Sequence, residues 1–297
     1  MAAFGRLITA MVTPFDAEGQ VDYAGANRLA LALLDSGSDG VVVSGTTGES
    51  PTLTMEEKRR LFLEVKAAVG NRGSVIAGTG SYSTAESIEL SAVAELAGVD
   101  GLLLVVPYYN KPTQDGLYAH FTAIARSTSL PCILYNVPAR TITNLLPETV
   151  VKLSQIHNIV GVKEASGNLE QIAAIIENTP DDFLVYSGND SDTLPVLSIG
   201  GYGVISVASH LVGLQIKRMM EKFIGGDFAG AASIHRQLLP LVNAMFVIAN
   251  PMPVKHSLNF VGFNVGKPRL PLLPPDPRTA AMIEEVVQNY HMDLPLH

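Results

Sequence analysis

The sequence contains one cysteine, few charged residues and no long hydrophobic run, and each shortage excludes a class of protein. Cys132 alone cannot form an internal disulfide, and its position in an apolar run predicts a buried, inert thiol in a reducing cytoplasm. Charged residues make up 16% of the chain and hydrophobic residues 47%, a balance that excludes a largely disordered protein. No apolar run approaches the roughly 18 residues of a membrane span, and residues 1–15 lack the features of a signal peptide. We therefore expect a cytoplasmic protein without membrane contact.

The motifs that bind nucleic acid, metal or nucleotides are missing as well. Asp and Glu outnumber Lys and Arg by 28 to 20, and the net charge of -8 argues against nucleic acid as a partner. The seven histidines are scattered without an H-E-x-x-H motif, so we expect no metal site. The chain has neither a Walker A loop nor a G-x-G-x-x-G loop, and we expect no organic cofactor.

What the chain does contain is a series of short runs rich in Val, Ile and Leu. They predict eight strands, at 7–12, 40–43, 74–77, 101–106, 132–135, 159–163, 183–187 and 203–207. The runs are apolar throughout rather than alternating, as in parallel strands that are covered on both faces. Most intervals between them suit one βα unit of about 25–35 residues.

Helical periodicity fills the segments between the strands. Thr54 and Ser83 are followed by early acids and indicate the starts of two helices. We expect the helices at 56–69 and 85–97 to bury Leu61, Val65 and Ala68, and Ile88, Ala92 and Leu96, respectively.

Eight such units predict a (β/α)8 TIM barrel over residues 1–224. The strand pattern stops there, and helices at 227–249 and 276–290 predict a C-terminal helical appendage over residues 225–297. A doubly wound sheet is the rival fold, but the first strand leads into Thr13 without a glycine-rich phosphate loop.

Polar residues follow most of the predicted strands directly. They lie at 13, 44–50, 78–80, 107–110, 135–140, 163–166 and 187–190. Because the active sites of barrels lie at the C-terminal ends of the strands, these clusters are the candidate site.

Lys163 gives the sharpest chemical signal. It ends an apolar strand, whereas the other eight lysines fall in helical or loop stretches where a solvated charge is the ordinary expectation. Desolvation would lower its pKa, and a neutral amine can attack a carbonyl to form a Schiff base. A buried lysine paired with an acid across the barrel is equally compatible. Glu164 is a poor partner because neighbouring residues of a strand point to opposite faces.

Three other features each allow two interpretations. Tyr135 can relay protons, or it can cap the barrel core. Arg140 can bind a carboxylate, or it can form a surface salt bridge. The backbone of the segment 44–50 can hold an anion, or it can form a plain tight turn.

The blocks Gly-Thr-Thr-Gly-Glu-Ser at 45–50, Tyr-Asn-Val-Pro-Ala-Arg-Thr at 135–141 and Gly-Val-Lys-Glu-Ala-Ser-Gly-Asn at 161–168 together resemble the dihydrodipicolinate synthase family. The wider family includes N-acetylneuraminate lyase and other pyruvate-dependent class I aldolases. The blocks at 107–112 and 187–190 follow in matching order, and the resemblance runs from Gly5 to about residue 265. Arg140 in its Val-Pro-x-Arg-Thr setting favours the synthases over the lyases.

The resemblance implies a lyase that condenses pyruvate with aspartate 4-semialdehyde to 4-hydroxy-tetrahydrodipicolinate, the first committed step of lysine and diaminopimelate biosynthesis. Lys163 would form the Schiff base with pyruvate. Tyr135, Thr46 and Tyr109 would relay protons, and Tyr109 would reach into the site of a neighbouring subunit. This implies a homo-oligomer, and we expect a tetramer built from two tight dimers.

The same resemblance assigns the residues that bind the substrates. Thr46 and Thr47 would hold the pyruvate carboxylate, and Arg140 the carboxylate of the semialdehyde. Gly188 and the backbone of Ile205 would line the pocket. Two alternatives stay open: an aldolase for a sugar acid such as N-acetylneuraminate or 2-keto-3-deoxygluconate, and a binding barrel that has lost catalysis.

Many synthases of the family are inhibited by lysine, which binds at the tight dimer interface. The corresponding positions in this sequence are Ser50, Pro51, Met55, Lys58, Tyr82, Glu86 and Tyr108. Lys58 would repel a cationic ligand, and Met55 cannot accept the hydrogen bond that an imidazole or amide could. We therefore expect weak or absent inhibition by lysine.

Overall fold

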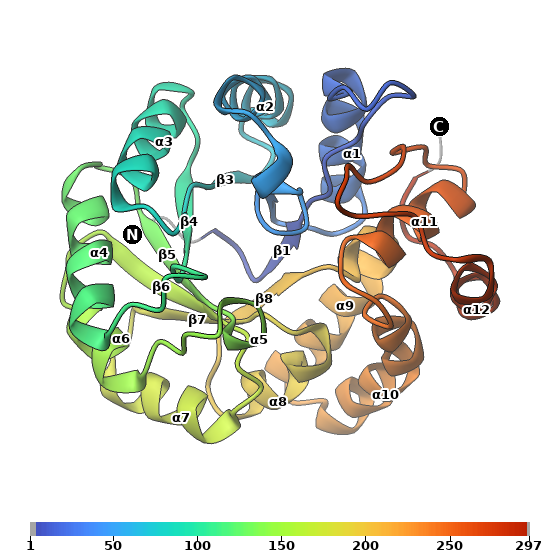
Figure 1. Ribbon diagram of the computed structural model, residues 1–297. Coiled ribbons are helices and arrows are strands. Elements are labelled where there is room, and N and C mark those ends of the chain that lie inside the picture. The colour runs from blue at the N-terminus through green and yellow to red at the C-terminus, as the bar shows by residue number, and fades with distance from the viewer. Residues whose placement is uncertain (1–3, 296–297) are drawn as a thin grey trace.

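The computed structural model describes residues 4–295, in which eight strands form a closed barrel surrounded by helices (Figure 1). The strands are β1 (Leu7–Ala10), β2 (Gly40–Val43), β3 (Ser74–Gly78), β4 (Gly101–Val105), β5 (Cys132–Asn136), β6 (Ile159–Glu164), β7 (Leu184–Ser187) and β8 (Gly203–Ser206). All are parallel, and β8 pairs with β1 to close the ring. The predicted (β/α)8 TIM barrel with C-terminal helices is therefore confirmed.

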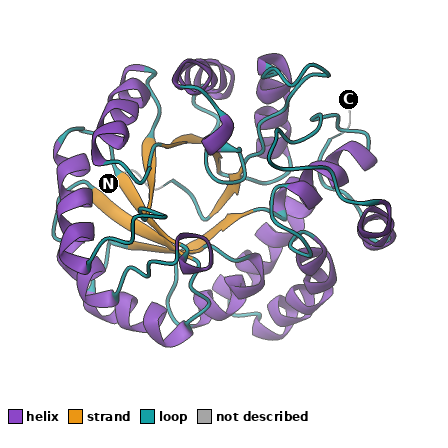
Figure 2. Cartoon of the chain, viewed as in Figure 1, coloured by secondary structure: helices purple, strands orange, loops and turns teal. Residues whose placement is uncertain are grey.

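Most of the helices lie outside the ring of strands, and the short helix α5 lies over the strand ends (Figure 2). The helices are α1 (Tyr23–Asp35), α2 (Met55–Val69), α3 (Thr84–Leu96), α4 (Gln114–Arg126), α5 (Pro138–Thr141), α6 (Pro147–Leu153), α7 (Leu169–Asn178), α8 (Thr193–Ser198), α9 (Ser209–Ile224), α10 (Phe228–Ala244), α11 (Met252–Phe260) and α12 (Pro277–Val287). The two predicted N-caps are confirmed, because the Thr54 side chain accepts from Glu57 N–H and the Ser83 side chain from Glu86 N–H.

Two layers of buried side chains explain why the strands are apolar on both faces. One layer fills the barrel and includes Ile8, Ile76, Ile133 and Ile205. The other lies between the strands and the surrounding helices. Each strand therefore contacts apolar groups on both sides, as in other barrels of parallel strands. Cys132 is fully buried, as expected, and burial raises the pKa of its thiol to about 12.

The buried face predicted for α3 is wrong. Leu96 is 87% exposed, and Leu90 and Ala94 face the barrel together with two serines instead. The serine hydroxyls can be buried because they are satisfied locally, as when Ser91 donates to the carbonyl of Ser87 at 2.6 Å. The spacing of apolar residues along a helix cannot reveal buried serines whose hydroxyls bond to the helix's own backbone.

The C-terminal helices pack beside α9 and the start of the chain rather than standing apart (Figure 1). The helices α10 and α12 lie within the predicted ranges, whereas α11 was not predicted. The barrel helices end with α9 at Ile224, and the division of the chain into two domains there stays a prediction. No helix within residues 4–295 is long and apolar enough to cross a membrane.

Candidate active site

A cavity of about 600 Å³ opens at the C-terminal ends of the strands, where the sequence placed the site. Thr46, Tyr135 and Arg140 line it together, although they come from two separate segments, 44–50 and 135–140. The seven positions that resemble a lysine pocket line the same cavity: Ser50, Pro51, Met55, Lys58, Tyr82, Glu86 and Tyr108. Thr46, Tyr135 and Arg140 therefore share one continuous space with these seven positions, whereas Lys163 and Tyr109 do not line it.

Lys163 lies on β6 and is only 5% exposed. Burial lowers the pKa of its amine to about 8, and the negative charge of Asp190 opposes that shift. Lys163 makes no ion pair within residues 4–295, which disfavours the alternative of a lysine held by an acid across the barrel. Near neutral pH a useful fraction of such an amine is uncharged and nucleophilic.

Asp190 is the acid whose charge opposes the fall in the pKa of Lys163. It belongs to the polar cluster that follows β7. Its carboxylate accepts hydrogen bonds from the Ser206 hydroxyl and from the backbone N–H groups of Val207 and Ala208. Burial raises the pKa of Asp190, and these hydrogen bonds oppose the shift. Asp190 therefore connects the loop after β7 to the loop after β8.

Tyr135 is the partner of Lys163 across the pair β5 and β6. The Nζ atom of Lys163 lies 4.4 Å from the centroid of the Tyr135 ring. Burial raises the pKa of the Tyr135 phenol, while the Arg140 guanidinium and the Thr46 hydroxyl pull it down. A phenol in such surroundings keeps its proton at neutral pH and can pass it along hydroxyl groups.

Glu164 confirms the expected alternation along β6, because it points away from the barrel interior. Its buried carboxylate accepts from the side chains of Asn136 and Gln171 and from the backbone N–H of Ser166. Asn136 also binds the backbone N–H of Leu145. This network supports the segment that follows β5, on which Arg140 lies.

The segment 44–50 forms a tight turn after β2. Ser44 and Glu49 both adopt a positive φ, 57° and 56°, at the two ends of the turn. The Thr13 hydroxyl donates to the carbonyl of Gly48 at 2.7 Å, and the Asn250 side chain donates to the hydroxyl of Thr47 at 2.7 Å. Residues from both ends of the chain therefore hold this turn.

Arg140 lies on the short helix α5 at the mouth of the cavity. Its guanidinium donates to the backbone carbonyl of Asn250 at 3.2 Å, and it forms no ion pair with any residue in the described part of the chain. The surface salt bridge that the sequence left open is therefore not seen, and the charge is directed toward the cavity.

Five of the eight predicted site residues do not line the cavity within one chain: Lys163, Thr47, Ile205, Gly188 and Tyr109. Lys163 and Thr47 are buried beside two residues that do line it, Tyr135 and Thr46. Ile205 is buried inside the barrel. Gly188 lies after β7, and a side chain there would come within 2.6 Å of the Ala165 Cβ, so the close approach of the two loops requires glycine. Tyr109 is 92% exposed and adopts a φ of 75°, which is uncommon for a bulky residue.

Sequence reasoning missed Asn250 and Lys255, which contact the turn after β2 from the C-terminal segment. Only residues that directly follow strands were taken as candidates, and these two lie far from any strand. The expectation that every lysine other than Lys163 is solvated is wrong for Lys255, which is 1% exposed. Its burial depends on a partner more than 200 positions away, which no local pattern reveals.

This (β/α)8 barrel has a cavity at its C-terminal end that a tyrosine and an arginine line, and a desolvated lysine lies against that tyrosine. Such an arrangement is the architecture of a lyase of the class I aldolase type. Comparison with known proteins supports this class. Residues 3–290 match the model of the dihydrodipicolinate synthetase family. The 4-hydroxy-tetrahydrodipicolinate synthase of Dehalococcoides mccartyi is 64% identical over 296 residues, which is 100% of both chains.

Solved structures give the same result. A dihydrodipicolinate synthase from Bacillus anthracis has a TM-score of 0.96 at 48% identity, covering 98% of this chain and 99% of that chain. A second one from Cyanidioschyzon merolae, with lysine bound, has a TM-score of 0.95 at 50% identity, covering 96% and 97%. The chain therefore belongs to the dihydrodipicolinate synthetase family. The predicted 4-hydroxy-tetrahydrodipicolinate synthase activity is confirmed, and the sugar-acid alternative is not favoured.

Proposed function

We propose that Lys163 forms a Schiff base with pyruvate and that the enzyme then condenses this adduct with aspartate 4-semialdehyde. The observation that carries the proposal is the burial of Lys163 against Tyr135, which lowers the pKa of the amine to about 8. A fully solvated lysine would be protonated almost completely at neutral pH and could not attack a carbonyl.

The reaction then follows in four steps. The neutral amine of Lys163 attacks the carbonyl carbon of pyruvate, and loss of water gives the imine. Loss of a proton from the methyl group gives an enamine, whose carbon attacks the aldehyde of the second substrate. The amino group of that substrate attacks the imine carbon and closes the ring. The bond to Lys163 breaks, and the amine is released for the next turnover.

Protons must move in several of these steps, and the proposed relay is Tyr135 with Thr46 and Tyr109. Tyr135 and Thr46 line one cavity, and the Thr46 hydroxyl opposes the rise in the pKa of Tyr135 that burial causes. Because Tyr109 is highly exposed in one chain, we propose that it completes the relay in a neighbouring subunit. The functional unit is then a dimer, and we propose a tetramer of two such dimers.

The substrate carboxylates need separate binding groups. Thr46 and Thr47 lie in the turn after β2, whose backbone N–H groups can bind the pyruvate carboxylate. Arg140 carries a positive charge at the cavity mouth and suits the carboxylate of the semialdehyde. We place Gly188 and the backbone of Ile205 along the wall behind the reacting atoms, where small or backbone groups leave room for pyruvate.

Trapping with borohydride tests the covalent step directly, because it reduces the imine to a stable amine. After incubation with pyruvate, peptide mass spectrometry should locate one adduct, on Lys163. Lys255 is the internal control, since burial also lowers the pKa of its amine to about 8 but an ion pair occupies it. Lys163→Ala should lose the adduct and most of the turnover. An adduct on another lysine of the active enzyme would disprove the assignment.

A further inference from the structure

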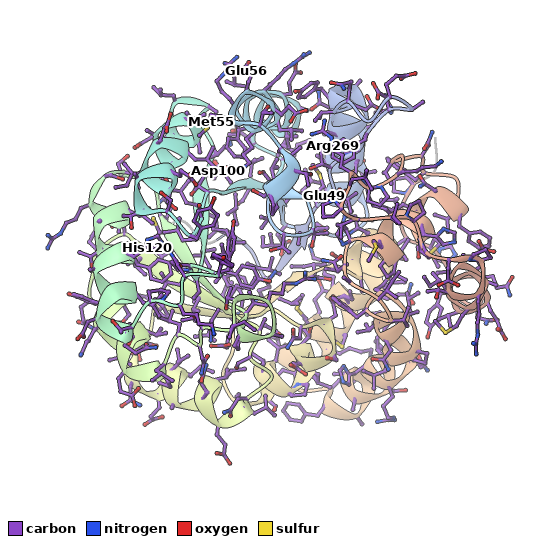
Figure 3. The ribbon with its side chains drawn as sticks, viewed as in Figure 1. Glu49, Met55, Glu56, Asp100, His120 and Arg269 are labelled. Carbon is purple, nitrogen blue, oxygen red and sulfur yellow. The ribbon has the colours of Figure 1, made fainter. Side chains whose placement is uncertain are left out.

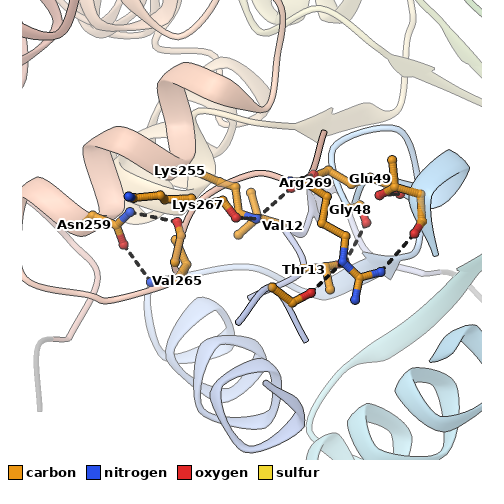
Figure 4. Close-up of polar contacts among 12 residues, drawn as sticks. Val12, Thr13, Gly48, Glu49, Lys255, Asn259, Val265, Lys267 and Arg269 are labelled. Atoms are coloured by element: carbon orange, nitrogen blue, oxygen red, sulfur yellow. Dashed lines mark hydrogen bonds and ion pairs between the residues drawn. The ribbon is translucent and has the colours of Figure 1, made fainter. Parts of the chain in front are cut away.

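The most deeply buried ion pair within residues 4–295 joins the turn after β2 to the C-terminal helix α11. Lys255 lies on α11 with a side chain that is 1% exposed, and its Nζ donates to Glu49 Oε1 at 2.7 Å (Figure 4). Glu49 belongs to the turn after β2, and its side chain is fully buried. The proposed reaction uses neither residue, so the pair requires an explanation of its own.

Both carboxylate oxygens of Glu49 and the amine of Lys255 have hydrogen-bond partners. The second carboxylate oxygen of Glu49 accepts from the backbone N–H of Arg269 at 2.8 Å. Lys255 also donates to the carbonyl of Lys267 and lies 4.1 Å from the centroid of the Phe15 ring. Figure 3 shows Glu49 on the turn after β2 with Arg269 beside it. Two segments that follow α10 therefore converge on one carboxylate.

A pair this deep is not the simplest way to stabilise a fold. The free energy of removing two charges from water offsets much of their attraction. A protein with apolar residues of similar size at these positions is often equally stable. What a hydrogen-bonded ion pair adds is a fixed geometry, because both partners must meet at defined positions. The question is which group this geometry fixes.

The answer lies in the backbone of Glu49. Its N–H donates to the carbonyl of Thr46 at 3.1 Å, so the turn that carries Thr46 and Thr47 closes on Glu49. Its φ of 56° is unfavourable for a residue with a side chain and has to be held in place. The ion pair holds that side chain on the outer side of the turn. Asn250 makes a second contact from the same C-terminal segment, to the hydroxyl of Thr47.

We propose that Lys255, acting through Glu49, is a positioning residue that holds the turn at Thr46 and Thr47 in the shape that binds the carboxylate of pyruvate. This inference rests on the proposed function of that turn. It assigns to the C-terminal helices an indirect part in substrate binding, because Lys255 acts through Glu49 and does not touch pyruvate.

The test compares stability with pyruvate binding in two variants. Lys255→Met should lower the melting temperature and raise the pyruvate concentration for half-maximal borohydride trapping on Lys163 by about tenfold, because small displacements of binding groups are costly. The double variant E49L/K255M removes both charges and should recover much of the lost melting temperature. Its half-maximal concentration should stay raised, since the geometry of the turn is not restored. If Lys255 had a purely structural role, the double variant would recover the melting temperature and the half-maximal pyruvate concentration together.

Lys66→Met is the matched control. Lys66 pairs with Asp100 at 2.7 Å near the start of β4, at the opposite end of the barrel. This variant should have a lower melting temperature, and its pyruvate concentration for half-maximal trapping should equal that of the wild type. If Lys255→Met does not fold, Glu49→Gln, which keeps the size of the side chain, takes its place.

The outcomes separate this inference from the proposed function. A half-maximal pyruvate concentration within about threefold of wild type in both Lys255→Met and E49L/K255M would overturn the positioning role, since displaced binding groups should cost more. Absence of any adduct on Lys163 in the wild-type enzyme at saturating pyruvate would overturn the proposed function instead.

Discussion

The amine of Lys163 lies against the face of the Tyr135 ring, with 4.4 Å between Nζ and the ring centroid, and the two residues are partners across β5 and β6. An aromatic face favours a cation, whereas burial disfavours it. The same tyrosine therefore has two separable parts: a ring that affects the charge of the amine and a hydroxyl that can move protons.

Two substitutions at Tyr135 should separate those parts. Tyr135→Phe keeps the ring, so the pH midpoint for trapping Lys163 should stay near that of wild type while turnover falls by about 10²–10⁴-fold, the usual contribution of a proton relay. Tyr135→Leu removes the ring as well, and the midpoint should move to lower pH because the cation loses its support. Borohydride trapping across a pH series measures both. Identical midpoints in the two variants would contradict the role of the ring.

The pH dependence of the wild-type enzyme follows from the pKa of Lys163, which burial lowers to about 8. Below that pH the amine is mostly protonated, so the rate of trapping at subsaturating pyruvate should fall about tenfold for each further pH unit. Above it the rate should level off. A rate that continues to climb toward pH 10, the ordinary range of lysine, would show that Lys163 is not desolvated in solution.

Mixing two inactive variants tests whether Tyr109 serves a neighbouring site. Tyr109→Phe and Tyr135→Phe should each have little activity alone. In a mixed dimer one of the two sites has both tyrosines intact, so an equal mixture that exchanges subunits should reach about a quarter of wild-type activity. Activity assays before and after unfolding and refolding the mixture provide the measurement. No gain over the separate variants, with mixed dimers demonstrated, would refute the sharing of Tyr109.

Lysine should inhibit this enzyme weakly or not at all. Lys58 lines the cavity, where burial lowers the pKa of its amine and Glu86 opposes that shift. Its residual charge disfavours a cationic ligand, and Met55 beside it offers no strong acceptor. A titration at subsaturating pyruvate should show half-inhibition above about 1 mM lysine, equivalent to roughly 4 kcal/mol of binding free energy. Lys58→His should be more sensitive, and inhibition of wild type at lower concentrations would refute the interpretation.

The strands were predictable because burial on both faces leaves an apolar run that is visible without any partner. The first strand was predicted to end at Val12, but β1 ends at Ala10. Met11 and Val12 continue the apolar run beyond the end of the strand. The N–H of Val12 donates to the side chain of His210 rather than to a neighbouring strand. Sequence alone cannot show that a distant side chain replaces a strand partner.

The candidate site was predictable to the extent that its residues lie near the C-terminal ends of strands. Tyr135 and Lys163 are the next-to-last residues of β5 and β6, and Thr46 follows β2. The contacts that support these residues were not predictable. Asn250 and Lys255 belong to a segment without strands, and both bind the turn after β2 from about 200 positions away. Such pairs are created only when the chain closes on itself, so they leave no periodicity in the sequence.

The contact between Glu49 and the backbone N–H of Arg269 can form only late in translation, because Arg269 is synthesised long after the barrel strands. A growing chain completes all eight strands once residue 206 has left the ribosome. Glu49 obtains its second partner only after residue 269 has emerged, by which time about nine-tenths of the protein has been made. A nascent barrel of this kind can therefore be closed while the turn that carries Thr46 and Thr47 is still unsupported.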